Sequence, residues 1–385
     1  MSAPHRTPHR TPRRARTAAA AALVTVLALT TAACQGQSPH PVPPAAGSSL
    51  PPVELSDIQD FIAKVPSWKA DDWSKWAAKN GFTPEDIEAV RNFWDHKKVD
   101  DAKGIDTPTA DPSKVRTPTA KEVVFPSLIR ARPQAHPYDP NTAVVGKMLV
   151  ETDEGTGHCS GTVVSDPSNP GKSNLVWTAA HCVHGGKDGK PFRNLAFIPA
   201  YNRSGALSNG KKKTAPDADR APLGIWVSNN FYVMPQWTKE GLHYGNPASQ
   251  FDFAVVRVVP PKGSTRSLEE TVGGSVPVWF GAQPEDIASP SAYGYPAATP
   301  FDGVELEHCD SAPKPTPFVF DRSRPPMLSI GCNMTGGSSG GGWFTRKDGK
   351  TVLFSNTSIG NDIWLAGPNL GPDAKRMFDA FQQTR

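Results

Sequence analysis

The stretch Thr335-Gly336-Gly337-Ser338-Ser339-Gly340-Gly341-Gly342 decides how the rest of this sequence is interpreted. It lies late in a chain of 385 residues and contains five glycines. Glycine tolerates positive φ and close approach of the backbone, so several N–H groups can turn toward one point. Donors arranged in this way stabilise the oxyanion of acyl transfer. The stretch therefore predicts Ser339 as a nucleophile and the N–H groups of Gly337 and Ser339 as an oxyanion hole, whereas the alternative is a flexible linker.

Two distant stretches favour the nucleophile over the linker. Val176-Trp177-Thr178-Ala179-Ala180-His181-Cys182 places a histidine after a strand-like run, and Phe251-Asp252-Phe253-Ala254-Val255-Val256-Arg257-Val258 places a carboxylate at the head of another. Taken alone, His181 is typical of a structural histidine and Asp252 of an exposed residue at a strand start. The order His181, Asp252, Ser339 is one of the orders in which Ser-His-Asp triads occur.

With these motifs the chain resembles the trypsin-like (chymotrypsin-fold) serine peptidases, in their bacterial secreted branch. Residues 178–182, 252–256 and 337–341 are similar to the histidine, aspartate and serine motifs of that family. One position departs from the pattern, because Ser338 stands where the family usually has an aspartate. The resemblance covers residues 143–385.

The fold implied by the resemblance is mainly β. It consists of two antiparallel six-stranded β-barrels (chymotrypsin-like) with a C-terminal helix, preceded by a small helical N-terminal extension. Many short apolar runs separated by turn residues are typical of such barrels. Residues 372–383 have the apolar spacing of a helix. We expect strands at 144–150, 159–164, 175–178, 195–198, 223–227, 253–258, 276–280, 292–295, 304–307, 327–330, 342–345 and 351–354.

The activity implied by the resemblance is that of a serine endopeptidase acting on peptides or proteins through the three motif residues, with no cofactor and no metal. Three further residues are expected to bind substrate. Asn333 stands six residues before the nucleophile, where trypsins have an aspartate, and Ser358 and Gly360 belong to a stretch that resembles the strand along which substrate backbone pairs. A non-catalytic extracellular binding protein on the same scaffold is the alternative, because fold alone does not imply activity.

The five cysteines suggest an oxidising compartment. The resemblance implies a disulfide between Cys159 and Cys182 beside the catalytic histidine, which leaves Cys309 to pair with Cys332. Cys34 is the fifth, and it resembles the lipid-modified cysteine of bacterial lipoproteins. The alternative is plain cleavage nearby, with Cys34 left in a disordered tail.

Residues 1–33 have the layout of a secretory signal peptide, with an arginine-rich start, an apolar run and small residues before Cys34. They also account for the net charge of +4, because they contain five arginines and no acidic residue. Without them the chain has 36 basic and 37 acidic residues, so its charge does not suggest nucleic acid as a partner. We expect an extracellular monomer, secreted or lipid-anchored to the outer face of the cell membrane, that meets a membrane only through Cys34.

The chain divides into five ranges, the first four by composition and sequence pattern and the last by the resemblance. The sequence Thr83-Pro84-Glu85-Asp86 combines an N-cap with a proline at the first helical position, which predicts a helix start. The helical range before the protease-like part is interpreted as an extension covering apolar surface, as a pro-segment that assists folding or blocks the cleft, or as a cell-wall or partner-binding module. The ranges are 1–33 (signal peptide), 34–53 (disordered tether), 54–100 (helical extension or pro-segment), 101–142 (linker) and 143–385 (trypsin-like domain).

Overall fold

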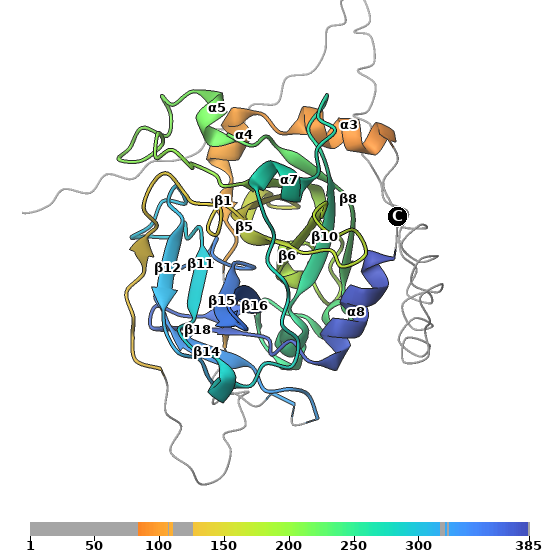
Figure 1. Cartoon of the computed structure of the whole chain (residues 1–385), viewed down its shortest axis with the longest axis vertical. Coiled ribbons are helices and arrows are strands. Elements are labelled where there is room, and N and C mark those ends of the chain that lie inside the picture. Colours follow the sequence, from red (N-terminus) through yellow and green to blue (C-terminus); the bar gives the residue numbers. More distant parts are fainter. Residues whose placement is uncertain (1–83, 107, 111–125, 316–319, 322, 384–385) are drawn as a thin grey trace, which may run out of the picture. The chain divides into compact units, whose positions relative to one another are not determined.

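The computed structural model describes residues 84–106, 108–110, 126–315, 320–321 and 323–383. Six strands that begin soon after residue 143 form a closed antiparallel barrel (Figure 1). They are bonded in the order β5-β4-β7-β8-β10-β6, and a further pairing of β6 with β5 closes the ring. Their bounds are β4 Val145–Thr152, β5 Gly155–Val164, β6 Leu175–Thr178, β7 Arg193–Pro199, β8 Trp226–Val233 and β10 Ala254–Val259.

Strand β3 and the strands that follow β10 form two further sheets, one of five strands and one of four. In the hydrogen-bond pattern these are separate sheets, whereas the first barrel is a continuous ring. The five-stranded sheet has the order β16 (Lys350–Asn356), β15 (Gly342–Lys347), β11 (Ser291–Gly294), β12 (Glu307–Asp310) and β3 (Arg132–Pro133). The four-stranded sheet has the order β13 (Lys314–Pro315), β14 (Leu328–Gly331), β18 (Trp364–Gly367) and β17 (Ile359–Gly360).

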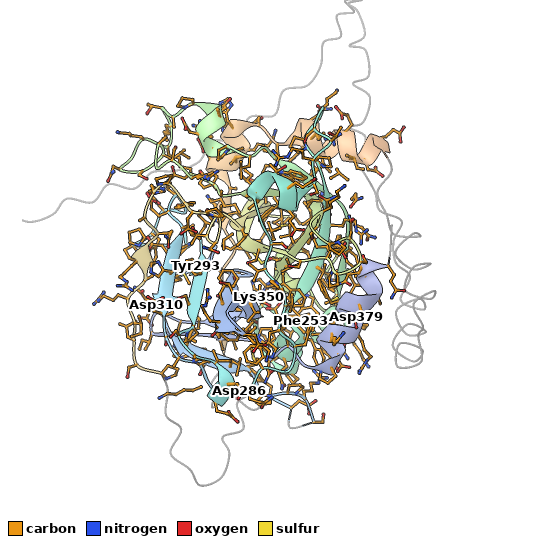
Figure 2. All side chains as sticks on the ribbon, in the orientation of Figure 1. Phe253, Asp286, Tyr293, Asp310, Lys350 and Asp379 are labelled. Atoms are coloured by element: carbon orange, nitrogen blue, oxygen red, sulfur yellow. A yellow bond between two sulfur atoms is a disulfide. The ribbon has the colours of Figure 1, made fainter. Side chains whose placement is uncertain are left out.

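Aromatic packing joins the barrel to the C-terminal helix α8 (Pro372–Gln382). The ring of Trp177 on β6 lies 5.7 Å from that of Phe253 and 5.9 Å from that of Phe378, measured between centroids. Figure 2 shows Phe253 among the packed side chains beside α8, on which Asp379 is labelled. Large aromatic side chains contribute most of the burial free energy of a core. The predicted C-terminal helix is therefore confirmed, and it covers one side of the barrel.

The helical prediction at residue 84 is also confirmed. Helix α3 runs over Pro84–Phe93 and is followed by α4, His96–Asp101. The indole N–H of Trp94 donates to the carbonyl of Asn194 on β7, so this region packs on the first barrel. Earlier helices expected between residues 54 and 83 lie outside the described residues. The remaining helices are α5 (Asp217–Arg220), α6 (Pro235–Glu240) and α7 (Leu268–Val272).

Three very short strands lie in residues 101–142, the range interpreted as a linker, and one of them is β3 of the five-stranded sheet. Strand β1 (Lys103–Gly104) runs parallel to β5, and β2 (Thr109–Ala110) runs parallel to β9 (Tyr244–Gly245). The chain therefore leaves α4 and pairs with two separate parts of the following structure. Among the described residues, we find no helix with the length and apolar character needed to cross a membrane.

Candidate active site

His181 lies in a single 3-10 turn, Ala180–Cys182, directly after strand β6. The next residue, Cys182, forms a disulfide with Cys159 on β5, as the resemblance implied. The turn is thus fixed on one side by the barrel strand and on the other by the covalent link. Closing a loop of this length stabilises the fold by about 3 kcal/mol in the chain-entropy model. The side chain of His181 is buried.

Asp252 follows the 3-10 helix Pro247–Phe251 and precedes strand β10. That short helix begins with a capping box at Asn246, which fixes where it starts and therefore where Asp252 lies. The Asp252 side chain is buried, with 1% exposure. Its Oδ1 accepts the backbone N–H of His181 at 2.9 Å, and its Oδ2 lies 2.6 Å from His181 Nδ1. The hydroxyl of Ser358 also donates to Oδ2, at 2.6 Å.

Ser339 lies in the glycine-rich loop between β14 and β15 and is fully buried. Its carbonyl accepts the N–H of Ser160, on β5, at 2.7 Å. The following residue, Gly340, has φ +77°, and a Cβ there would lie 2.1 Å from Thr178 Oγ1 and 2.8 Å from Ala179 N. The serine loop therefore packs directly against the residues that lead into His181. Only glycine permits this approach.

The other end of the loop is held by hydrogen bonds within the chain. Gly337 has φ +97°, and its carbonyl accepts the hydroxyl of Ser160 at 2.9 Å. The hydroxyl of Ser338 donates to Thr335 O at 2.7 Å. The N–H of Gly337 donates to the carbonyl of Ile105, which belongs to the segment after α4, at 2.8 Å.

The three residues expected to bind substrate lie on the four-stranded sheet or beside it. Asn333 follows Cys332, which forms the disulfide with Cys309, and its Oδ1 accepts the N–H of Ala131 at 2.7 Å. Ser358 comes just before β17, and Gly360 ends it. The N–H of Gly360 donates to the carbonyl of Pro108 at 3.1 Å.

Comparison with known proteins identifies the family. The model of the lysyl endopeptidase C-terminal domain matches residues 130–222. The chain is similar to the solved structure of a thermostable serine protease, AL20, from an extremophilic microorganism, with a TM-score of 0.50 and 27% identity over 64% of this chain and 100% of that one. It is also similar to protease Anisep from Arthrobacter nicotinovorans, with a TM-score of 0.50 and 28% identity over 65% and 98% of the two chains. The chain is a trypsin-like serine protease. A comparison with curated proteins finds no match.

The serine protease has the chymotrypsin fold and acts as an endopeptidase on peptides or proteins. Its two disulfides fit an oxidising, extracellular compartment. Cys159, His181 and Cys182 form a group close enough to bind a metal ion, but the two sulfurs are already bonded to each other.

Several buried polar residues of the protease were not anticipated from the sequence. Asn356 accepts the indole N–H of Trp177 and donates to the carbonyl of Asp252, so it connects the later strands to the histidine and aspartate motifs. His158 lies between the carbonyls of Ala102 and Tyr295, and burial lowers its pKa to about 3, so the ring is neutral. Such residues give no periodic signal, and only their position next to a motif could have identified them.

Removing the Ser358 hydroxyl should impair turnover by this protease. A hydrogen bond to a charged group contributes about 1.5–3 kcal/mol. We therefore expect Ser358→Ala to lower kcat by about tenfold or more, with little change in KM. The measurement is steady-state hydrolysis of a peptide. The control is Ser329→Ala, which removes a buried hydroxyl that donates to the carbonyl of Lys314 on β13. An unchanged kcat in Ser358→Ala would show that this hydrogen bond does not support catalysis.

Proposed function

We propose that this endopeptidase cleaves peptide bonds through a triad of Ser339, His181 and Asp252. The observation that carries the proposal is the buried pair of His181 and Asp252, with Nδ1 and Oδ2 2.6 Å apart. The other ring nitrogen, Nε2, is buried and has no hydrogen-bond partner among the described residues. A buried nitrogen of this kind is suited to accept a proton in the reaction.

In the first half of the reaction, Ser339 Oγ attacks the carbonyl carbon of the substrate while His181 Nε2 takes the hydroxyl proton. Asp252 holds the proton on Nδ1 and stabilises the imidazolium that forms. The tetrahedral intermediate then expels the amine, which receives the proton from Nε2. An acyl group remains on Ser339.

In the second half, a water molecule replaces the amine. His181 Nε2 removes a proton from the water as it attacks the acyl carbon, and the proton then returns to Ser339 Oγ. The acid product leaves and the free hydroxyl is restored. The negative oxygen formed in both halves is bound by the N–H groups of Gly337 and Ser339, and each such donor typically contributes about 10²- to 10³-fold in rate.

The substrate backbone is proposed to add to the edge of β17, where the N–H of Gly360 is a donor. Edge-strand addition gives affinity through backbone hydrogen bonds and leaves side-chain pockets to set specificity. Ser358 thus has two roles. Its backbone lies just before this edge, and its hydroxyl donates a hydrogen bond to the Asp252 carboxylate.

Substitution of the triad tests the proposal most directly. Ser339→Ala should lower kcat by about 10⁶-fold, and His181→Ala by a similar factor, because the two groups act as a unit. The double variant should lose little more than either single variant. A fluorophosphonate probe, followed by mass spectrometry, should label Ser339 in the native chain and not in Ser339→Ala. Additive losses in the double variant, or label on another residue, would contradict the triad; complete absence of label would support the alternative of a non-catalytic binding protein.

Side-chain preference is proposed to be for uncharged residues. Asn333 carries no charge, so the attraction that an aspartate would exert on arginine or lysine is missing at this position. The measurement is a cleavage profile of a peptide library. The matched family model is named for lysyl endopeptidases, so a profile dominated by lysine is the competing result and would reject the role given to Asn333.

The chain is proposed to be exported and attached to lipid at Cys34. The supporting observation is the position of Cys34 directly after the apolar and small residues of the predicted signal peptide. Mass spectrometry of the native N-terminus should find a chain that begins at Cys34 and carries acyl groups. An unmodified N-terminus at another residue, with the protein free in the medium, would reject the anchor and leave plain secretion.

A further inference from the structure

The segment that follows α4 crosses the candidate active site. We call residues 103–106 and 108–110 the strap. Its first part pairs with β5, where Lys103 lies opposite Gly157 and Gly104 opposite His158. Its last part pairs with β9. The strap therefore spans from the barrel strand that carries Cys159 to the segment that precedes Asp252.

Two backbone donors assigned to substrate are occupied by the strap. The N–H of Gly337, proposed for the oxyanion hole, donates to the carbonyl of Ile105 at 2.8 Å. The N–H of Gly360, proposed for the substrate backbone, donates to the carbonyl of Pro108 at 3.1 Å. A substrate that uses these donors has to displace both carbonyls first.

The fit between the strap and the serine loop is close on both sides. A Cβ on Gly336 would lie 3.0 Å from Asp106 Cα and 3.0 Å from Ile105 O. A Cβ on Gly104 would lie 2.6 Å from Gly336 O. The N–H of Ile105 also donates to the carbonyl of His158 at 2.9 Å. Backbone thus lies against backbone, and glycine on each partner makes this possible.

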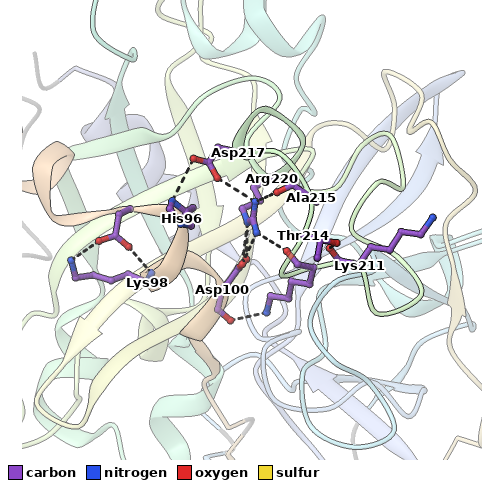
Figure 3. Close-up of polar contacts among 10 residues, drawn as sticks. His96, Lys98, Asp100, Lys211, Thr214, Ala215, Asp217 and Arg220 are labelled. Carbon is purple, nitrogen blue, oxygen red and sulfur yellow. Dashed lines mark hydrogen bonds and ion pairs between the residues drawn. The ribbon is translucent and has the colours of Figure 1, made fainter.

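A largely buried ion pair fixes the start of the strap (Figure 3). Arg220 and Asp100 have side-chain exposures of 5% and 14%, and Arg220 Nη2 donates to Asp100 Oδ2 at 2.9 Å. Arg220 Nε donates to both carboxylate oxygens at 3.1 Å. Lys212 Nζ donates to the carbonyl of Asp100 at 2.7 Å. Because Asp100 lies in α4, this contact fixes the strap at its entry to the site.

We propose that the strap is a self-inhibitory segment, which keeps the protease in a low-activity form until it is displaced or cut away. The inference rests on the proposed function, since it assigns Gly337 and Gly360 to the reaction. It gives the N-terminal region a specific role, namely occupation of the cleft by residues 103–106 and 108–110. If the segment served only to cover apolar surface, weakening its contacts would leave the rate of reaction at Ser339 unchanged.

Substitution of Gly104 should release the inhibition. A side chain at this position collides with Gly336 O and with Ala297 Cβ, which would lie 2.9 Å from the new Cβ. In the full chain, we expect Gly104→Val to raise the rate of fluorophosphonate labelling at Ser339, and of peptide hydrolysis, by about tenfold or more. The matched control is Gly274→Val, where a Cβ meets no atom within 4 Å, and it should behave like the native chain.

Two further measurements keep the test decisive if Gly104→Val folds poorly. Asp100→Asn weakens the ion pair with Arg220. It should raise the rates of labelling and of hydrolysis, by a smaller factor than Gly104→Val. A synthetic peptide of residues 101–110, added to the Asp100→Asn variant, in which the chain's own strap is weakened, should inhibit hydrolysis by raising KM. The same peptide with valine in place of Gly104 should inhibit much less.

The outcomes separate this inference from the proposed function. If the native chain and the strap variants label Ser339 and hydrolyse peptide at equal rates, the strap is not inhibitory and the triad stands. A peptide 101–110 without effect on KM would also reject the strap. If folded native and variant chains neither label nor hydrolyse, the proposed triad fails and the inference fails with it.

Discussion

Burial of the Asp252 carboxylate is the constraint on which the arrangement of the site depends. Removing a charged group from water costs several kcal/mol unless donors replace the lost hydration. Here the donors are the backbone and ring of His181 and the hydroxyl of Ser358. One comes from the first barrel and the other from the edge of the four-stranded sheet. The carboxylate therefore has all of these hydrogen bonds only when the first barrel and the four-stranded sheet are packed together. The same packing orients the ring of His181.

The glycine-rich loop depends in the same way on a residue from the other part of the fold. Ser160, on β5, donates its N–H to the carbonyl of Ser339 and its hydroxyl to the carbonyl of Gly337, and it accepts the N–H of Tyr295. Two carbonyls of the loop are thus turned toward the barrel. With Ser338 bonded to Thr335, the loop is held by neutral hydrogen bonds where the resembling family uses an aspartate.

The sequence predicted most of the regular elements, for identifiable reasons. The continuous apolar run at 175–178 is a strand with those bounds, and the proline-based start at residue 84 is the start of α3. The expected strand at 276–280 was wrong, because Val276 and Val278 form only isolated bridges to other strands. An apolar run can be buried without a partner strand along its length, and alternation alone does not distinguish the two cases.

Site residues that lie within a sequence motif could be predicted. Contacts between residues far apart in the sequence could not. Cysteine pairing followed from the family resemblance, and both disulfides are present. The role of the Ser358 hydroxyl and the pairing of β1 and β2 could not be predicted. A two-residue strand has no periodicity, and its partners are set by long-range packing that a single sequence does not reveal.

The strap belongs to the same chain as the cleft that it occupies, and the ion pair between Asp100 and Arg220 holds its start close to that cleft. A segment joined covalently to its own cleft meets it at an effective concentration in the millimolar range when the connection is short. That value is set by the length of the connection and not by how much protein is present. Dilution of the protein would therefore leave the strap in place. Because the strap lies between α4 and β3 in the sequence, a single break after α4 leaves it joined to the protease on its C-terminal side, and its release as a free peptide requires a second break after residue 110.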